Sequence, residues 1–200
     1  MTFRALARCL ALAVAPALLW SGCATPPAPF SASPAWTARQ PALGQLSRWR
    51  AVVRIGVVNE RDGWHANFQW EQRGADYRID LVGPLGQGRV VVRGADGQVQ
   101  VQTQDGQSWS APDPDAALEQ SLQVRLPVSG LRYWIRGLPE PGSRPVMQTD
   151  DQGRLTRLEQ NGWVIEYPAY TPVAPLELPA RIVARRLDLS VKLVIEQWTL

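Results

Sequence analysis

Histidine and cysteine are scarce in this sequence, which has one histidine and two cysteines among its 200 residues. Metal sites usually draw their ligands from these residue types, so we expect no metal centre. His65 occupies a polar position of an alternating stretch, where a solvated side chain is expected rather than a base or a ligand. Patterns typical of a serine nucleophile, a phosphate-binding loop or a dinucleotide-binding loop are also missing. We therefore expect no enzyme, no catalytic residue and no cofactor.

The apolar run near the N-terminus, Leu10–Trp20, is too short to span a bilayer. It follows Arg4 and Arg8 and leads into Leu19-Trp20-Ser21-Gly22-Cys23, which resembles a bacterial lipobox. This order indicates a signal peptide at residues 1–22 that is removed, leaving Cys23 as an acylated N-terminus. A secreted protein with one free thiol is the alternative.

Disulfides are excluded on this interpretation, since Cys9 is lost with the signal peptide and Cys23 is acylated. Residue 24 is alanine, and resemblance to enterobacterial lipoproteins, in which aspartate at this place retains the protein in the inner membrane, implies sorting to the outer membrane. Residues 23–35 are rich in proline, alanine and serine and are expected to form a flexible tether. Residues 36–200 are expected to form one domain with a sizeable core.

A large excess of positive charge is missing as well. The formal net charge is +3, and it falls further when Arg4 and Arg8 leave with the signal peptide. No run of lysine and arginine interleaved with aromatic residues remains. A nucleic-acid partner is therefore not expected.

Alternation of apolar and polar residues with a period of two dominates the domain, and short turn signals separate the alternating runs. Strands joined by short turns are antiparallel neighbours. Helices are expected at Pro41–Arg48, Asp115–Val124 and Gly130–Arg136, the last capped by Ser129, and Pro168–Pro179 is expected to be a proline-rich loop. The sequence thus predicts an α+β fold: one strongly curved antiparallel sheet of about ten or eleven strands with two or three short helices over its open face.

One connection, Gly83–Gly88, combines three glycines and a proline with a leucine at its centre. It joins the runs Tyr77–Val82 and Arg89–Arg93, both of which read as strands. Leu85 could fold back onto the core, or it could be held out as a hydrophobic finger for an apolar partner. The residues alone leave both alternatives open.

Tryptophan is abundant, with eight of nine tryptophans remaining after residues 1–22 are removed. Trp64, Trp70, Trp134 and Trp163 fall on the faces expected to point inward. These aromatic residues could fill a solid core, or they could line an apolar cavity large enough for a lipid. Periodicity cannot distinguish a full interior from a hollow one.

Several short motifs, taken in order, resemble the outer-membrane lipoprotein receptor family LolB. They are Trp64–Trp70, Asp76-Tyr77-Arg78-Ile79, Gly83-Pro84-Leu85-Gly86, Leu126-Pro127-Val128, Gly137-Leu138-Pro139, Gln160-Asn161-Gly162-Trp163 and the closing run Val191–Trp198. The resemblance runs from the lipobox to the C-terminus. It implies an unclosed antiparallel β-barrel whose helices cover a hydrophobic cavity.

The resemblance also implies a function and its partners. A LolB-type receptor accepts acylated lipoproteins from the periplasmic carrier LolA and inserts them into the inner leaflet of the outer membrane. The partners implied are therefore a LolA-type carrier, the acyl chains of lipoproteins and the outer-membrane leaflet, with the protein itself a monomer facing the periplasm. The rival hypothesis is a structural or scaffolding outer-membrane lipoprotein with a solid core and no lipid ligand.

The site hypothesis has three groups. Cys23, at the end of the lipobox, is the lipid anchor, and the resemblance implies that Leu85 is the membrane-inserting tip, with Gly83, Pro84 and Gly86 holding it out. The expected walls of the cavity or core are Trp64, Phe68, Trp70, Ile79, Leu81, Leu131, Trp134 and Trp163.

Overall fold

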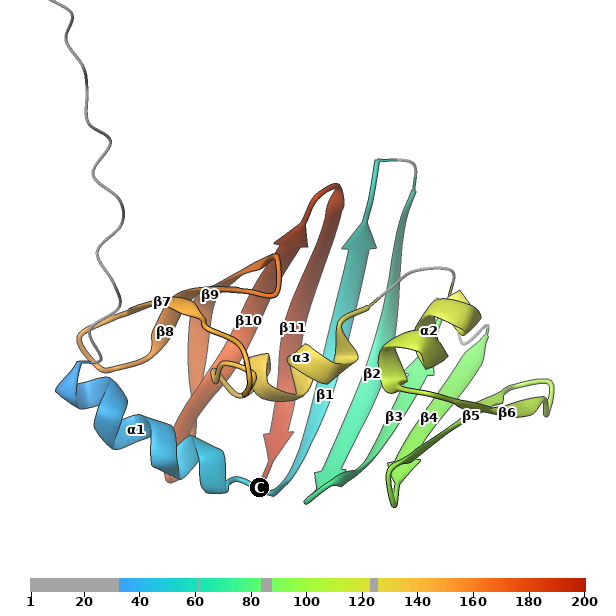
Figure 1. Ribbon diagram of the computed structural model, residues 1–200, viewed down its shortest axis with the longest axis horizontal. Coiled ribbons are helices and arrows are strands. Elements are labelled where there is room, and N and C mark those ends of the chain that lie inside the picture. Colours follow the sequence, from blue (N-terminus) through green and yellow to red (C-terminus); the bar gives the residue numbers. More distant parts are fainter. Residues whose placement is uncertain (1–32, 61, 84–87, 123–125) are drawn as a thin grey trace, which may run out of the picture.

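In the described part of the chain, one antiparallel sheet of eleven strands carries three helices on one of its faces (Figure 1). The computed structural model describes residues 33–60, 62–83, 88–122 and 126–200. The helices are α1 (Pro34–Gln45), α2 (Pro114–Leu122) and α3 (Val128–Trp134). The strands are β1 (Arg48–Val58), β2 (Gly63–Arg73), β3 (Asp76–Val82), β4 (Arg89–Ala95), β5 (Gln98–Thr103), β6 (Ser108–Ala111), β7 (Val146–Thr149), β8 (Leu155–Gln160), β9 (Trp163–Val173), β10 (Leu176–Arg186) and β11 (Leu189–Thr199).

The first and last strands meet in the middle of the sheet. The strand order is β6-β5-β4-β3-β2-β1-β11-β10-β9-β8-β7, so β1 pairs with β11 and each half of the chain forms its own meander. The two outer strands, β6 and β7, are not neighbours, and the sheet therefore stays open. The predicted α+β class, the single unclosed antiparallel sheet and the strand number are confirmed.

Alternating burial fixes which face of the sheet the helices cover. In β1 every second residue from Trp49 to Val57 is buried, and the residues between them face outward or are half-buried. A strand places successive side chains on opposite faces, so this period of two gives each strand one apolar face. The apolar faces meet α1, α2 and α3, and the core lies between the sheet and the helices.

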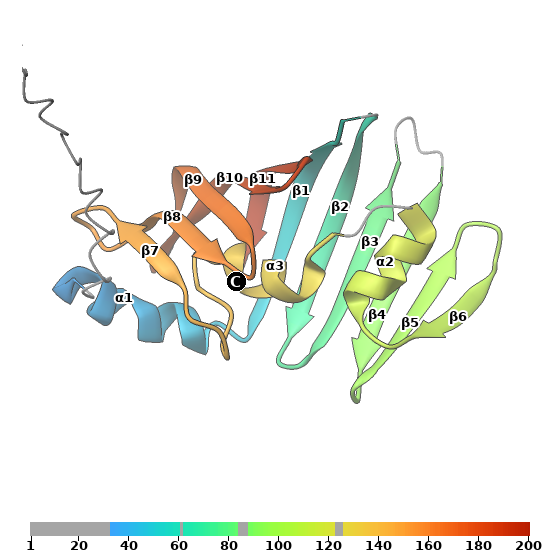
Figure 2. The same cartoon turned by 45° about the horizontal axis from the view of Figure 1, so that its top comes forward.

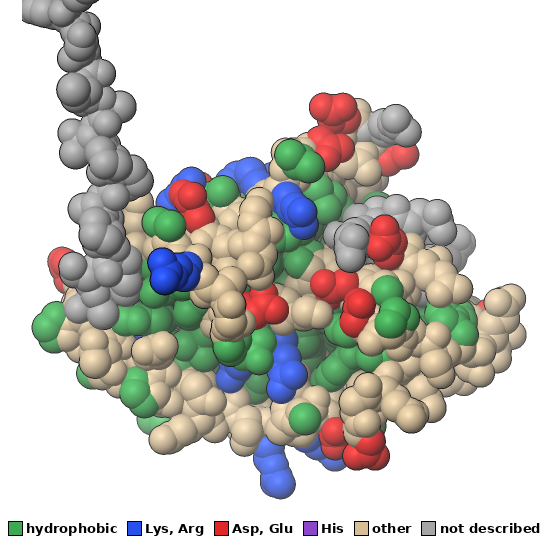
Figure 3. Space-filling model, viewed as in Figure 1, with side chains coloured by type: hydrophobic (Ala, Val, Ile, Leu, Met, Phe, Trp, Pro, Cys, Tyr) green, Lys and Arg blue, Asp and Glu red, His purple; other side chains and the backbone are tan. Residues whose placement is uncertain are grey.

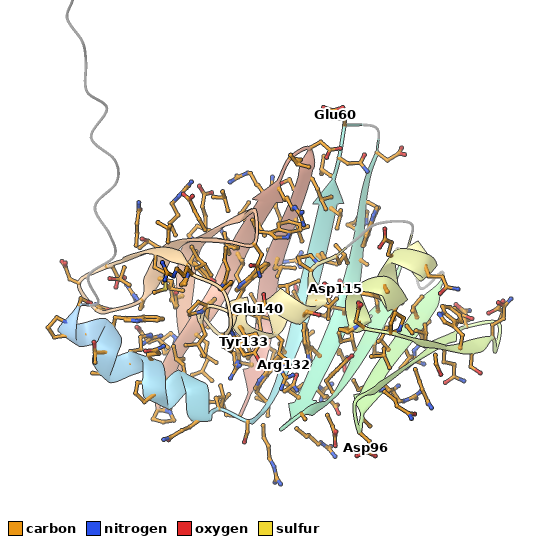
Figure 4. All side chains as sticks on the ribbon, viewed as in Figure 1. Glu60, Asp96, Asp115, Arg132, Tyr133 and Glu140 are labelled. Carbon is orange, nitrogen blue, oxygen red and sulfur yellow. The ribbon has the colours of Figure 1, made fainter. Side chains whose placement is uncertain are left out.

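The hairpin turns lie at the two ends of the strands, which we call the upper and lower edges of the sheet. The turns at the upper edge include β1–β2, β3–β4, β8–β9 and β10–β11, closed by the pairs Val58↔Gly63, Val82↔Arg89, Gln160↔Trp163 and Arg186↔Leu189. The β2–β3 and β4–β5 turns lie at the opposite, lower edge. Figure 2 shows the β10–β11 turn beside the upper ends of β1 and β2, and in Figure 4 Glu60 marks the upper edge and Asp96 the lower one.

The expected proline-rich loop at Pro168–Pro179 is wrong, because these residues extend β9 and β10 into a long hairpin. Proline cannot donate a hydrogen bond, so it is tolerated in a strand only where one side is unpaired. That condition holds here: the pairing of β8 with β9 ends at Glu166, and the pairing of β11 with β10 begins at Arg181. The prolines therefore occupy a part of the hairpin that is two strands wide.

Two helix predictions also need correction. The first helix spans Pro34–Gln45 instead of Pro41–Arg48, because Ser33 caps its N-terminus and accepts a hydrogen bond from the Trp36 N–H at 3.1 Å. Pro41 is exposed inside this helix, while Trp36 and Leu43, two turns apart, hold it on the sheet. The helix expected at Gly130–Arg136 starts at Val128 after Pro127, without the side-chain cap assigned to Ser129.

The helix expected at Asp115–Val124 corresponds to α2, which spans Pro114–Leu122, and residues 123–124 lie outside the described residues. Asp113 caps its first turn and accepts a hydrogen bond from the Ala116 N–H at 2.8 Å. This contact agrees with the preference of aspartate for the position before a helix and of proline for its first turn.

Candidate functional site

A small apolar space lies between the sheet and the two central helices. Its volume is about 20 Å³. The sheet contributes Ile55, Phe68, Trp70, Ile79 and Leu81, and the helices with the segment between them contribute Leu118, Leu126, Val128 and Leu131. Every one of these side chains is buried. The space could admit no more than a water-sized molecule and has no polar wall to hold one.

Five of the eight expected wall residues surround this space: Phe68, Trp70, Ile79, Leu81 and Leu131. Four other wall residues, Ile55, Leu118, Leu126 and Val128, were not among those expected. The alternation of the first strand and the apolar side of the helix before Leu126 contained the signals for Ile55 and Leu118. Neither signal shows which part of a long sheet a helix will cover.

The remaining three expected residues lie elsewhere. Trp134 and Trp163 pack against each other with ring centroids 6.2 Å apart, away from the residues around the small space. Trp134 also donates from Nε1 to Oε1 of the buried Gln160 at 2.9 Å. Trp64 is only partly buried at the side of the core. These three tryptophans contribute to packing in the observed conformation.

Close packing at α3 depends on a glycine. A Cβ atom placed on Gly130 would come within 2.6 Å of the ring of Trp134, one turn later on the same helix. Only glycine at position 130 leaves the indole room to lie along the helix. The Gly130–Trp134 pair therefore sets how α3 rests on the C-terminal half of the sheet.

Arg136 fastens α3 to the end of α1. This buried side chain donates from Nη1 to the carbonyl oxygens of Leu43 and Leu46, at 3.1 and 3.0 Å. The last carbonyls of a helix lack partners in the following turn and carry partial negative charge, which suits a guanidinium; the Leu43 carbonyl also accepts from the Leu46 N–H at 3.3 Å. Burial lowers the pKa of Arg136 from its usual value. The same guanidinium lies 5.6 Å from the centre of the Tyr133 ring.

A groove of about 410 Å³ opens at the lower edge, between the β2–β3 and β4–β5 turns and the two central helices. Its walls carry charges of both signs, including Asp76, Asp96, Asp113, Arg132 and Glu140. In Figure 4, Arg132 and Tyr133 lie below α3, toward the edge marked by Asp96. The face shown in Figure 3 likewise mixes hydrophobic side chains with scattered acidic and basic ones.

The groove and the small apolar space share two walls, Trp70 and Val128. Tyr77 forms part of the groove, and burial raises its pKa to about 12, so its hydroxyl stays neutral. Its ring lies against Gly94, where an added Cβ would come within 2.1 Å. The groove thus adjoins an apolar layer made of buried side chains.

The base of the Gly83–Gly88 loop is well defined at the upper edge. The Gly83 N–H donates to the Gly88 carbonyl at 3.0 Å, and Gly88 has φ +70°, a conformation that favours glycine. Below it, Asp80 accepts from Arg89 Nε at 2.7 Å and from Arg78 Nη2 at 3.0 Å. The predicted hairpin is confirmed. Pro84, Leu85 and Gly86 lie outside the described residues, as does Cys23.

We expect Asp80→Asn to weaken the base of this loop and to remove a pH dependence. The hydrogen bond from Arg89 holds the pKa of Asp80 below its usual range, against the opposing effect of partial burial. The carboxylate therefore stabilises the fold above about pH 4, and this contribution is lost as the pH falls through the pKa of the folded state. The loss should be small, because Arg89 is exposed and water screens its charge.

Urea unfolding of both proteins at pH 7, 4 and 3 would measure this effect. The parent should be the more stable at pH 7, and the difference should shrink toward pH 3. A difference that stays constant over this range would show that the carboxylate charge is not what holds the loop base.

Within the described ranges, no group of three or more histidine, cysteine, aspartate or glutamate side chains could hold a metal ion. His65 is exposed, as expected for the polar face of its strand. No helix in the described part of the chain is long and apolar enough to cross a membrane.

Comparison with known proteins settles the family. Residues 47–198 match the family model described as "Outer membrane lipoprotein LolB". The chain belongs to the LolB family. Curated LolB relatives include the outer-membrane lipoprotein LolB of Pseudomonas paraeruginosa, which is 39% identical over 163 residues, covering 82% of this chain and 80% of the relative. The LolB protein of Pseudomonas fluorescens is 37% identical over the same shares of the two chains.

Solved structures agree on the fold. A LolA-superfamily protein of Nitrosomonas europaea matches with a TM-score of 0.53 and 9% identity, covering 78% of this chain and 87% of its own. A putative outer-membrane lipoprotein-sorting protein domain of Vibrio parahaemolyticus matches with a TM-score of 0.50 and 7% identity, covering 82% and 90%. At such identities the likeness shows a shared LolA/LolB-type fold and no more.

Proposed function

We propose that this protein is the outer-membrane receptor that takes acylated lipoproteins from a LolA-type periplasmic carrier and inserts them into the inner leaflet of the outer membrane. Membership of the LolB family supports an outer-membrane lipoprotein with a role in lipoprotein localisation. The carrier, the acyl-chain ligand and the direction of transfer are the finer parts of the proposal.

The observation that carries the proposal is the buried apolar layer beside an open groove. A 16-carbon acyl chain resists transfer to water by on the order of 12 kcal/mol, at about 0.8 kcal/mol per CH₂. A lipoprotein with several chains must therefore be shielded throughout its passage. The apolar faces of β1–β3, α2 and α3 supply the shielding surface, and the groove at Trp70 and Val128 supplies an approach to it.

Loading requires the central helices to move. A methylene group is about as large as a water molecule, which takes up about 30 Å³, so one chain needs roughly 500 Å³. The observed space is about 20 Å³. The structure is therefore the empty, closed form on this proposal, and a chain enters as α2 and α3 separate from the sheet. No energy source is needed if each successive environment binds the chains more favourably than the last.

Anchoring and insertion complete the proposal. Acylated Cys23 holds the receptor at the outer membrane by a tether at residues 23–35, facing the periplasm as a monomer. Leu85, with Gly83, Pro84 and Gly86 around it, enters the leaflet. Burying one leucine contributes only about 1.5–3 kcal/mol. This is too little to extract acyl chains, but it is enough to orient a receptor that is already anchored.

A transfer assay tests the proposal directly. The full acylated chain, reconstituted in liposomes, is mixed with a radiolabelled lipoprotein bound to LolA, and the lipoprotein recovered in the liposomes is measured. The parent should deliver cargo, and Leu85→Glu should deliver at least about tenfold less, as expected for the loss of one buried leucine. Gln87→Glu adds the same charge to the same loop but keeps the leucine, and it should transfer nearly as well as the parent.

Absence of transfer by the parent protein would overturn the receptor proposal. Equal transfer by the parent and Leu85→Glu would remove the role of Leu85 while leaving the receptor in place.

The small volume of the apolar space favours one alternative, a structural outer-membrane lipoprotein with a solid core. That alternative predicts that no fatty acid binds and that α2 and α3 keep their positions in the presence of lipoprotein. Spin labels on α2 and on the outer face of β5 would measure the separation. The receptor predicts an increase of about 4 Å on loading, which is one layer of carbon atoms.

A further inference from the structure

Leu187 is the most exposed large hydrophobic side chain in the described part of the protein, at 96% exposure; Val58 follows at 52%. It forms the turn between β10 and β11 together with Asp188, closed by the pair Arg186↔Leu189. Its backbone has φ +52°, in the left-handed region that leucine rarely adopts. An apolar side chain in water and an unfavourable backbone conformation thus occur at one residue.

Two comparable turns in the same sheet show what this position ordinarily holds. Asp96 and Asn161 begin the two-residue turns of the β4–β5 and β8–β9 hairpins, each with φ +53° and each followed by glycine. Aspartate and asparagine tolerate this conformation because their short polar side chains bond locally. The leucine side chain has no polar atom and cannot form such a local hydrogen bond. A residue that is unfavourable in both respects points to a role outside the folded domain.

The position of Leu187 in the sheet indicates which side of the protein this role involves. Ser190 pairs with Val58 at the end of β1, so the β10–β11 turn is beside the β1–β2 turn at the upper edge (Figure 2). The Gly83–Gly88 loop opens from the same edge, two strands farther along. The β10–β11 hairpin that carries Leu187 and the β3–β4 hairpin therefore belong to different halves of one sheet.

We propose that Leu187 inserts into the lipid leaflet as a second membrane contact of this protein, a step that rests on the proposed function. Arg185 and Arg186 precede it and are exposed. An arginine beside an apolar tip can reach the phosphate layer while the leucine enters the acyl region. Asp188 is the other residue of the turn, and Arg185 is ion-paired with Glu166 (Nη1 to Oε2, 2.6 Å), so the local charges balance and the leucine carries the contact.

A lipid surface suits this tip better than a protein does. A stable protein interface buries about 1,200–2,000 Å² and needs complementary packing, which one leucine on a two-residue turn does not offer. A bilayer needs no matching pocket. Two insertion points on one edge also fix the orientation of the sheet. The groove at the lower edge then faces away from the membrane, toward the periplasm from which a carrier arrives.

Fluorescence at the tip tests the contact. Leu187→Cys in the full acylated chain is labelled with an environment-sensitive dye and reconstituted in liposomes that contain lipids with nitroxide-bearing acyl chains. Asp96→Cys is the matched control, because it has the same turn position and nearly the same φ at the opposite edge. The dye at 187 should shift to shorter wavelength and be quenched, and the dye at 96 should do neither. Equal signals at the two positions would overturn the proposal. A wavelength shift of the dye at 187 on addition of LolA without liposomes would also overturn it.

A second variant separates stability from membrane contact. Leu187→Asn suits the left-handed backbone and removes the exposed apolar group, so its melting temperature should rise by about 2–4 °C. Its delivery of lipoprotein to liposomes should nevertheless fall about tenfold, the equivalent of one lost leucine burial. Unchanged delivery would overturn the role of Leu187 in insertion.

The receptor proposal and the Leu187 proposal can fail separately. If the parent delivers cargo while the dye at 187 stays in water, only the Leu187 contact is wrong. If the dye enters lipid and the parent delivers nothing, the membrane contact stands and the receptor function is wrong.

Discussion

Replacing Gln160 with methionine is expected to lower the free energy of unfolding by about 3–5 kcal/mol, although the two side chains are similar in size. Gln160 is buried at the end of β8 and uses both ends of its amide. Its Oε1 accepts from Trp134 Nε1 at 2.9 Å and from the Glu140 N–H at 2.8 Å. Its Nε2 donates to the Glu140 carbonyl at 2.8 Å and to Ser143 Oγ at 2.7 Å.

The size of the effect comes from the partners that methionine would leave behind. An unpaired buried donor or acceptor costs about 1–3 kcal/mol, and the Trp134 indole and both backbone groups of Glu140 would lose this partner. The amide also joins α3 and the segment after it to the sheet. We therefore expect loss of stability together with loosening of α3.

Urea unfolding followed by tryptophan fluorescence measures this loss. Gln148→Met is the control, since Gln148 is an exposed glutamine on the neighbouring strand β7 and its replacement should change stability by less than about 0.5 kcal/mol. Should both variants unfold at the urea concentration of the parent, the hydrogen bonds of Gln160 would not be holding α3 to the sheet.

The sheet could be predicted from the sequence because its information is local. Alternation from Trp64 to Trp70 and the turn pairs Asp96-Gly97 and Asn161-Gly162 each specify structure within a few residues. The errors occurred where a distant contact overrides a local signal. Pro41 remains inside α1 because Trp36 and Leu43 pack on the sheet, and the prolines of the β9–β10 hairpin are tolerated because neighbouring strands are absent there.

The site was predicted less completely because burial does not determine neighbours. Trp134 and Phe68 both read as inward-facing, but Trp134 packs on Trp163 and Phe68 lines the small apolar space. In the sequence, Gln160 looks like an ordinary polar residue beside a turn. It becomes a buried hydrogen-bonding residue because α3 packs over it in the fold. The volume of the space depends on how far the helices stand from the sheet, which no periodicity records.

Leu118→Ala should make the protein less stable and a better binder of acyl chains. Leu118 is buried on α2 and forms part of the wall of the apolar space. Such a truncation typically costs about 2–5 kcal/mol, of which part is the transfer of the lost atoms and part is the cavity left behind. An acyl chain that fills the cavity would recover the part of the lost free energy that is due to the cavity, because dry apolar cavities bind apolar ligands. If about 1.4 kcal/mol is recovered, affinity rises about tenfold.

The prediction is specific because the two measured quantities change in opposite directions: stability falls while affinity for acyl chains rises. Stability is measured by urea unfolding, and affinity by titration with a fluorescent fatty acid. Leu43→Ala is the matched control, because Leu43 is equally buried but lies on α1, beside the other half of the sheet and away from the residues around the space (Figure 1). It should lose similar stability and leave affinity unchanged. Weaker binding by Leu118→Ala, or equal gains in both variants, would mean that acyl chains do not enter between α2 and the sheet, and the solid-core alternative would then be favoured.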